Sequence, residues 1–388
     1  MISTKFNYKI PLYLLIASVC SLMLSLFLLQ LFVGLISIIW LIESFENKRK
    51  AIDIFFTLIL IFGVVRILSI IFSQYPAESV KSFYKDALFY LSFFSFSYYL
   101  KSLGKEKIKF ISYIFIISAS AIALIGLILF NLKLVERAQS FSSGYATFSS
   151  YLLAALGVYI ALPFYNKSKY NSLLWPLGLS LILSGIITSM GRTNIAIAIL
   201  MFVIGLSFKK IKIKAAVLII IFTVVLSFIS FHNNKLEVTQ RVEHPTVLSD
   251  RNILIKGAID LALDHPILGF GPRTFHNIFP YVNELSDKGI GSWHNDFIQV
   301  YFESGILGLI AFLSIIFTFI FYGIKYLRNM KTNNEFNEIV FGILLGFIGL
   351  VLSALTAGFI DSPVLSIVFA FLISLLSAIL FHLKYSFN

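Results

Sequence analysis

The sequence predicts an all-α polytopic membrane protein with about twelve transmembrane helices and one long loop that contains short helices. The first observation is composition: 58% of the 388 residues are hydrophobic and 13% are charged, whereas a soluble domain carries about 25% charged residues. The second is that the apolar runs are continuous over about 17–22 residues, which is the length of a membrane-spanning helix and not of a barrel strand. The third is that Lys and Arg gather in short clusters between these runs.

The apolar runs divide the chain into three parts. Residues 1–231 hold nine predicted spans, residues 232–303 form the long loop, and residues 304–388 hold three more spans. The predicted spans are two within 10–44, divided near Phe27, followed by 52–73, 86–101, 110–130, 148–165, 172–189, 193–208, 215–231, 304–324, 338–358 and 363–383.

The basic clusters orient these spans. With the N-terminus inside, nineteen of the 31 Lys and Arg residues fall in short segments on the inner side, as the positive-inside rule requires. Both termini are then cytoplasmic and the long loop lies outside. A net charge of +12 invites a nucleic-acid partner, but the clustered placement of the basic residues is typical of membrane topology, so we expect membrane lipids and no nucleic acid as partners.

The long loop is the unusual feature, because structureless loops of about 15 residues or more are uncommon and usually functional. Residues 250–263, "DRNILIKGAIDLAL", have apolar residues at helical spacing, with Asp250 as a plausible cap. Residues 265–275, "HPILGFGPRTF", are predicted to form a turn because Gly and Pro punctuate them. A helix that leads into the tenth span follows "SWHN" at 292–295.

Several charged residues lie at the predicted outer ends of the spans or in the outer loops. A charge near the membrane is costly and therefore informative, and the guanidinium fork of arginine binds two phosphate oxygens at once. Arginines without a matching group of carboxylates predict an anion site. The residues concerned are Arg66, Arg137, Arg192, Arg241, Arg251 and Arg273, with Asp361 at another tight outer turn.

Each of these residues also has a plainer interpretation. Arg192 at a helix end can extend to the membrane surface, and Arg66 can form a structural ion pair. Asp361 can cap the last span, and Arg241 is best read as a solvated loop residue. His294, taken alone, is an ordinary loop histidine.

A motif around His294 bears on that last interpretation. His294 and Asn295 are followed, after nine residues, by Gly305-Ile306-Leu307-Gly308. This resembles the H-[NSQ]-x9-G-x-x-[GTY] signature of the O-antigen ligase family, which O-antigen polymerases and some protein O-oligosaccharyltransferases share. Three further stretches resemble the same family: "SDRNILIKGAIDLALDHPILGFGPRTF", "MGRTNIAIAIL" and "GFIDSPVLSIVFAFL". The resemblance covers about residues 180–383, and it departs from the family at Gly191, where a serine usually precedes the arginine.

The resemblance implies transfer of a glycan from undecaprenyl diphosphate to an acceptor hydroxyl, at the periplasmic face of the bacterial inner membrane. Direct displacement would invert the anomeric centre. His294, with an ordinary pKa of about 6.5, suits the general base that takes the proton of the acceptor hydroxyl. Arg192 and Arg251 are the first choices for the diphosphate. The second choices are Arg66, Arg137 and Arg273, with Asn295 or Asp361 to orient the base or the arginines.

No Asp-x-Asp motif or His/Cys cluster faces outward in this topology, so we expect neither a metal nor another cofactor. Three functions stay open. The favoured one is an O-antigen ligase that joins a glycan to a lipid A–core oligosaccharide. The alternatives are an O-antigen polymerase acting on the same carrier and a transporter of lipid-linked sugars, although transporters usually show internal repeats and this sequence shows none.

Overall fold

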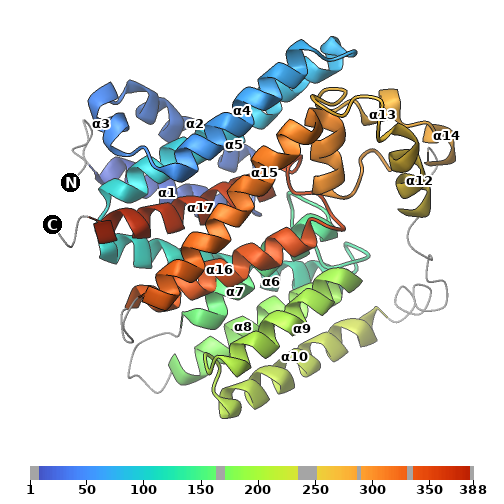
Figure 1. The fold of residues 1–388 in the computed structure, drawn as a ribbon. Coiled ribbons are helices and arrows are strands. Elements are labelled where there is room, and N and C mark those ends of the chain that lie inside the picture. The colour runs from blue at the N-terminus through green and yellow to red at the C-terminus, as the bar shows by residue number, and fades with distance from the viewer. Residues whose placement is uncertain (1–7, 163–170, 235–250, 286–289, 330–334, 385–388) are drawn as a thin grey trace.

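The computed structural model describes residues 8–162, 171–234, 251–285, 290–329 and 335–384. Within these ranges all regular secondary structure is helical. Both chain ends lie at one end of a helical bundle, and the helices between residues 251 and 285 lie at the other (Figure 1). We call these the terminus end and the loop end.

The bundle consists of the apolar helices α1 (Lys9–Ser21), α2 (Leu26–Ile42), α4 (Ile54–Ile71), α5 (Pro76–Ser102), α6 (Lys105–Asn131), α7 (Tyr145–Ala161), α8 (Asn171–Thr188), α9 (Arg192–Ser207), α10 (Ile213–Asn233), α15 (Asp296–Asn329), α16 (Glu335–Ser353) and α17 (Pro363–Lys384). The short helices are α3 (Phe45–Lys50) at the terminus end, and α12 (Arg251–Leu261), α13 (Phe275–Ile278) and α14 (Val282–Leu285) at the loop end.

Each predicted span falls on one of these helices. Six of them are long and apolar enough to cross a membrane by length and composition: α4, α6, α10, α15, α16 and α17. Five shorter helices, α1, α2, α7, α8 and α9, are also apolar. The protein is therefore a helical membrane protein, and twelve spans stays a prediction.

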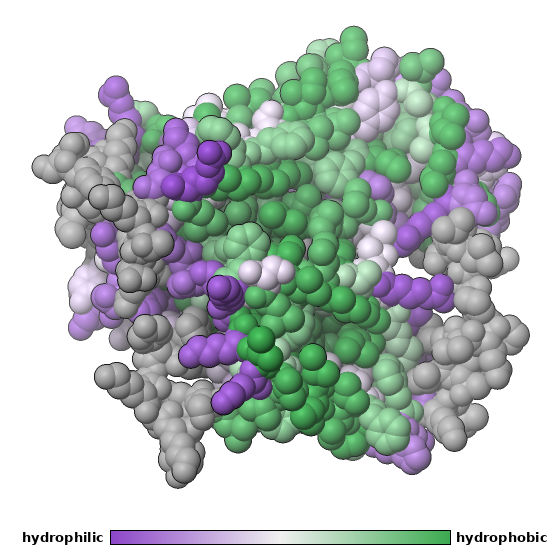
Figure 2. Space-filling model, turned by 60° about the horizontal axis from the view of Figure 1, so that its bottom comes forward, coloured by the Kyte–Doolittle hydropathy of each residue, from purple (hydrophilic) through white to green (hydrophobic). Residues whose placement is uncertain are grey.

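The surface agrees with this assignment. Figure 2 shows a wide apolar band between two polar ends. Inside the band, α7 and α17 are largely enclosed by the other helices, with nearly every residue of α7 buried. Gly157 of α7 lies directly against the backbone of Gly346 in α16, where a Cβ on either residue would collide with the other helix. Small residues bring membrane helices into close contact in this way.

The helix α15 is broken at Gly305, which has φ +63° and ψ −167°. The break frees the N–H groups of Ile306 and Leu307, which donate to the carbonyls of Pro266 (2.7 Å) and Ile267 (3.4 Å). A Cβ at position 305 would collide with the Ile267 carbonyl. Position 305, the first of the Gly-Ile-Leu-Gly part of the motif, therefore requires glycine for two reasons. Its backbone conformation is one that L side chains rarely adopt, and the turn at 265–273 approaches it closely.

The loop end confirms two local predictions. The helix expected over 250–263 is α12, although Asp250 itself lies outside the described residues. The turn expected over 265–275 is present, with positive φ at Gly269, Gly271 and Arg273. An aromatic cluster holds these pieces together: Phe270, Phe275, Phe279, Trp293 and Phe302 are all buried, and the rings of Trp293 and Phe302 stack with centroids 4.2 Å apart.

Candidate functional site

His294 lies at the loop end, directly before α15. Its backbone has φ +48°, a left-handed conformation that is uncommon outside glycine and often marks functional sites. The next residue, Asn295, caps α15: its Oδ1 accepts hydrogen bonds from the backbone N–H of Phe297 (2.9 Å) and Ile298 (3.2 Å). The histidine is thus held at a fixed turn at the start of a helix.

A turn at residues 354–361, between α16 and α17, frames the histidine. Three successive carbonyls of this turn accept hydrogen bonds from the neighbours of His294: Ala354 from the Asp296 backbone N–H (3.0 Å), Leu355 from Asn295 Nδ2 (3.3 Å) and Thr356 from Arg251 Nη2 (3.2 Å). Residues far apart in the chain, from α12, α15 and the α16–α17 turn, therefore meet at one point.

The carboxylate of Asp296 fixes the other side of that turn. It is fully buried and accepts from the backbone N–H groups of Phe359 (2.7 Å) and Ile360 (3.3 Å). A Cβ at Gly358 would lie 2.8 Å from Asp296 Oδ1, so the turn needs glycine there to come this close. Asp296 was not among the residues predicted from the sequence. Its carboxylate fixes the turn whose carbonyls accept hydrogen bonds from Arg251 and Asn295.

The surroundings keep His294 neutral. Burial lowers the pKa of its imidazole below the usual 6.5, and the nearby positive charge of Arg251 lowers it further. A neutral imidazole at neutral pH has a free lone pair and can accept a proton.

Arg192 begins α9 and is exposed. A chain of hydrogen bonds connects this helix start with the framing turn: Asn194 Nδ2 donates to Ser149 (2.7 Å) and Ser150 (3.3 Å), and the Ser150 hydroxyl lies 2.6 Å from the Ser353 hydroxyl, one residue before the turn. Within the described part of the chain, neither Arg192 nor Arg251 forms an ion pair. Both are cations at the loop end, and no carboxylate of the described residues pairs with them.

The residue before Arg192 departs from the family pattern. Gly191 has room for a side chain, since the nearest atom to a Cβ there would be the Ser189 hydroxyl at 3.5 Å. That hydroxyl donates to the Ile186 carbonyl at 2.7 Å and is buried. Ser189 therefore does not take the place of the missing hydroxyl.

Two other arginines are paired, and here one sequence-based expectation is wrong. Arg66 Nη2 lies 2.6 Å from Asp86 Oδ2 and Arg66 Nη1 lies 2.6 Å from Glu303 Oε2, with Arg66 only 4% exposed. Arg273 donates from its backbone to Glu303 Oε1 at 2.9 Å and from Nη2 to Asp86 Oδ1 at 3.2 Å. The premise that the arginines have no matching carboxylates fails for these two because α5 and α15 supply them.

Asp361 joins the same group. It accepts a hydrogen bond from Gln299 Nε2 and lies 3.7 Å from Arg273 Nη2. We call Arg66, Asp86, Arg273, Glu303 and Asp361 the ion network. Asp361 therefore lies beside Arg273, and a role for it in orienting His294, Arg192 or Arg251 stays a prediction. Two of the arginines named from the sequence remain. Arg137 lies over the Tyr145 ring at the start of α7, 4.0 Å from the ring centroid, and Arg241 lies outside the described residues.

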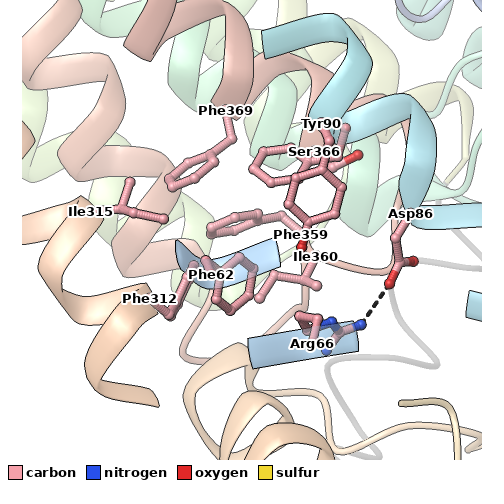
Figure 3. Close-up of a pocket in the computed structure, with 11 residues that line it drawn as sticks. Phe62, Arg66, Asp86, Tyr90, Phe312, Ile315, Phe359, Ile360, Ser366 and Phe369 are labelled. Carbon is pink, nitrogen blue, oxygen red and sulfur yellow. Dashed lines mark hydrogen bonds and ion pairs between the residues drawn. The ribbon is translucent and has the colours of Figure 1, made fainter. Parts of the chain in front are cut away.

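An apolar crevice runs beneath the ion network. Phe62, Phe312, Phe359 and Phe369 line it, and Arg66 paired with Asp86 closes its polar end (Figure 3). The empty volume is about 380 Å³, part of it open to the surface. Because the guanidinium at its end is already neutralised, the crevice offers apolar surface but no free cation.

Metal ligands show no comparable grouping. Across the residues that the structure describes, no three His, Cys, Asp or Glu side chains are placed to hold a metal ion.

Comparison with known proteins supports the motif. Residues 177–313 match the family model described as O-antigen ligase. The match runs from α8 to the first turns of α15 beyond Gly305, so it includes Arg192, Arg251, Arg273, His294 and Asn295 and confirms the resemblance over about a third of the chain. None of the curated proteins matches the chain. The family implies a glycosyltransferase-like ligase or polymerase that acts on lipid-linked glycans.

Proposed function

From this match, we propose that the protein is an O-antigen ligase that transfers a glycan from undecaprenyl diphosphate to a hydroxyl of a lipid A–core sugar. The observation that carries the proposal is the neutral His294 beside the guanidinium of Arg251. One turn accepts hydrogen bonds from Arg251 and from Asn295, the residue after His294. A proton acceptor next to a cation is what displacement of a diphosphate by an alcohol requires.

His294 acts in this proposal as the general base. Its imidazole accepts the proton of the acceptor hydroxyl while the hydroxyl oxygen forms a bond to the anomeric carbon. The bond from that carbon to the diphosphate oxygen breaks at the same time, and the electron pair leaves with the diphosphate. Attack opposite the leaving group inverts the anomeric centre.

Arg251 and Arg192 stabilise the departing diphosphate. Fixed cations aimed at a charge that develops in the transition state lower the barrier without a reorganisation cost. Arg251 is positioned by Thr356 and Arg192 by the start of α9. Arg66 and Arg273 are left out of this role, because a diphosphate would have to displace the carboxylates that already hold them.

The remaining parts of the proposal concern location and cofactors. The topology expected from the basic clusters puts the termini in the cytoplasm and the loop end in the periplasm, at the bacterial inner membrane. Transfer is metal-independent in this proposal. Purified protein is expected to remain active in EDTA, and a loss that Mg²⁺ or Mn²⁺ restores would contradict this.

The lipopolysaccharide ladder of a deletion strain tests ligase against polymerase. A ligase deletion removes polymer from the surface and leaves long chains on the lipid carrier. Single repeats on the core would instead identify a polymerase. Restoration of the ladder by the wild-type gene, but not by a His294→Ala gene expressed to the same level, links the phenotype to the site.

A further inference from the structure

The helix α12 carries an apolar stripe that its own packing does not use. Ile255, Ile259 and Leu263 follow each other at intervals of four residues and are 53%, 70% and 85% exposed. Four-residue spacing puts Ile255 and Ile259 on one face of the helix, and Leu263 lies in the turn just beyond its end. The opposite face, with Leu254 and Gly257, is buried against the aromatic cluster of the loop end.

Polar residues border this stripe on one side. Lys256, Asp260 and Asp264 are exposed, and Lys256 and Asp260 both contact Tyr281: the ammonium lies 4.3 Å from the ring centre and the carboxylate accepts from the hydroxyl at 2.7 Å. The exposed surface of α12 is therefore divided lengthwise into an apolar half and a charged half.

Both ends of α12 are tied to the ends of bundle helices. Arg251, its first residue, donates to Thr356, three residues beyond α16. Beyond its last residue, the carbonyls of Pro266 and Ile267 accept from Ile306 and Leu307 of α15. A helix of 11 residues spans about 16 Å, so α12 runs along the loop end from one bundle helix to another (Figure 1).

The stripe continues onto surface that faces lipid. Ile267, 62% exposed, follows Leu263, and its carbonyl accepts from the backbone N–H of Leu307 in α15, which is 43% exposed. α15 is one of the helices long and apolar enough to cross a membrane, so its exposed apolar side chains meet acyl chains.

We propose that α12 lies in the membrane surface, with Ile255, Ile259, Leu263 and Ile267 among the acyl chains and Lys256, Asp260 and Asp264 in water. The arrangement matches an interfacial amphipathic helix, which buries its apolar face at the boundary of head groups and acyl chains. Where the proposed function holds, this position of α12 in the membrane surface places Arg251 at the depth of the phosphates of a lipid-linked donor.

Fluorescence quenching of a probe on α12 tests the proposal. Cys20, the one cysteine of the chain, is first replaced by serine. An environment-sensitive thiol probe is then attached to Ile259→Cys or, as the matched control, to Asp264→Cys, an exposed charged position in the turn just after α12. Each protein is placed in nanodiscs at one copy per disc, with lipids that carry a nitroxide near the head-group end of the acyl chain.

We expect the nitroxide lipid to quench the probe at position 259 several-fold more than the probe at 264, and aqueous iodide to do the reverse. Equal access of iodide to both positions would overturn the proposal, because the stripe would then face water. A probe at 259 that neither quencher reaches would also overturn it and would indicate a protein partner. The measurement needs no transfer activity, so its outcome is independent of the proposed function.

Discussion

Two groups of charged side chains at the loop end, close together in the fold, are built on opposite principles. In the ion network, two arginines are paired with three carboxylates, and the five side chains are at most 29% exposed. At the His294 site, Arg251 and Arg192 have no carboxylate partner in the described residues, and the histidine has a left-handed backbone and a lowered pKa. The compensated group stabilises the packing of α4, α5 and α15. The uncompensated group has arginines without a carboxylate partner in the described residues and a histidine with a lowered pKa, which are the features expected where a substrate completes the site.

The largest effect expected from this contrast is on catalysis. His294→Ala should reduce glycan transfer by about 10²–10⁴-fold, the usual contribution of a general base, while leaving donor binding and thermal stability unchanged. The control is His276→Ala, since His276 is an exposed histidine of the same loop region. Near wild-type transfer by purified His294→Ala protein would remove the histidine from the mechanism.

A substitution that breaks the ion network should lower the stability of the folded protein. Arg66→Met leaves Asp86 and Glu303 as buried charges with one cation fewer, and breaking a buried pair in this way costs about 3–5 kcal/mol. Thermal unfolding in a fixed detergent should show a clearly lower midpoint for this variant than for Arg251→Met.

A second variant distinguishes charge from packing. Arg66→Met combined with Glu303→Gln removes a cation and an anion together and should be more stable than Arg66→Met alone. If the single variant unfolds at the wild-type temperature, the network does not stabilise the fold and its arginines become available for a substrate role.

These expectations also show how far the sequence alone could lead. The positions of the helices were predictable because lipid requires long apolar segments, and the turn at 265–273 was predictable from its Gly and Pro residues. The helix predicted to follow "SWHN" begins at Asp296, although the predicted span itself started only at 304, because Asp296, Gln299 and Glu303 interrupt the apolar run. Their i, i+3, i+7 spacing was the missed signal: it puts them on one helix face, which the structure buries.

The pairing of charges could not be predicted from the sequence. Asp86 and Glu303 lie 20 and 237 residues from Arg66, and their proximity follows from how α4, α5 and α15 pack. The same holds for Asp296, whose partners are backbone N–H groups at 359 and 360. Side chains that act on backbone leave no pattern of residue types to recognise.

The two unpaired arginines should act on one ligand. Each Arg→Lys change at 192 and 251 keeps the charge but loses the two-oxygen fork, so turnover should fall about tenfold, whereas Arg→Ala should also weaken donor binding. The double Arg→Ala variant should cost less than the sum of the single variants, because the two side chains bind the same diphosphate. Donor titration of the four proteins measures this. Arg49→Lys, an exposed arginine of α3 at the terminus end, is the control, and strictly additive losses would mean that the two arginines do not share a ligand.

The smallest effect concerns pH, and it measures how closely Arg251 and His294 act together. Since burial and the charge of Arg251 both lower the histidine pKa, the base stays neutral as the pH falls to the ordinary value of about 6.5, and the acidic limb of kcat/KM should lie below it. Arg251→Gln removes the charge but leaves the burial, which is the larger cause. The limb should therefore move to higher pH while remaining below the ordinary value. Arg251→Lys retains the charge and should leave the limb in place, although its rate is lower.

Arg192→Gln is the matched control, because Arg192 does not contribute to the histidine pKa and its loss should lower the rate without moving the limb. If Arg251→Gln and Arg192→Gln give the same limb as the wild type, the titrating group is not His294 beside Arg251. The catalytic role of the His294 site in the contrast between the two charge groups is then contradicted.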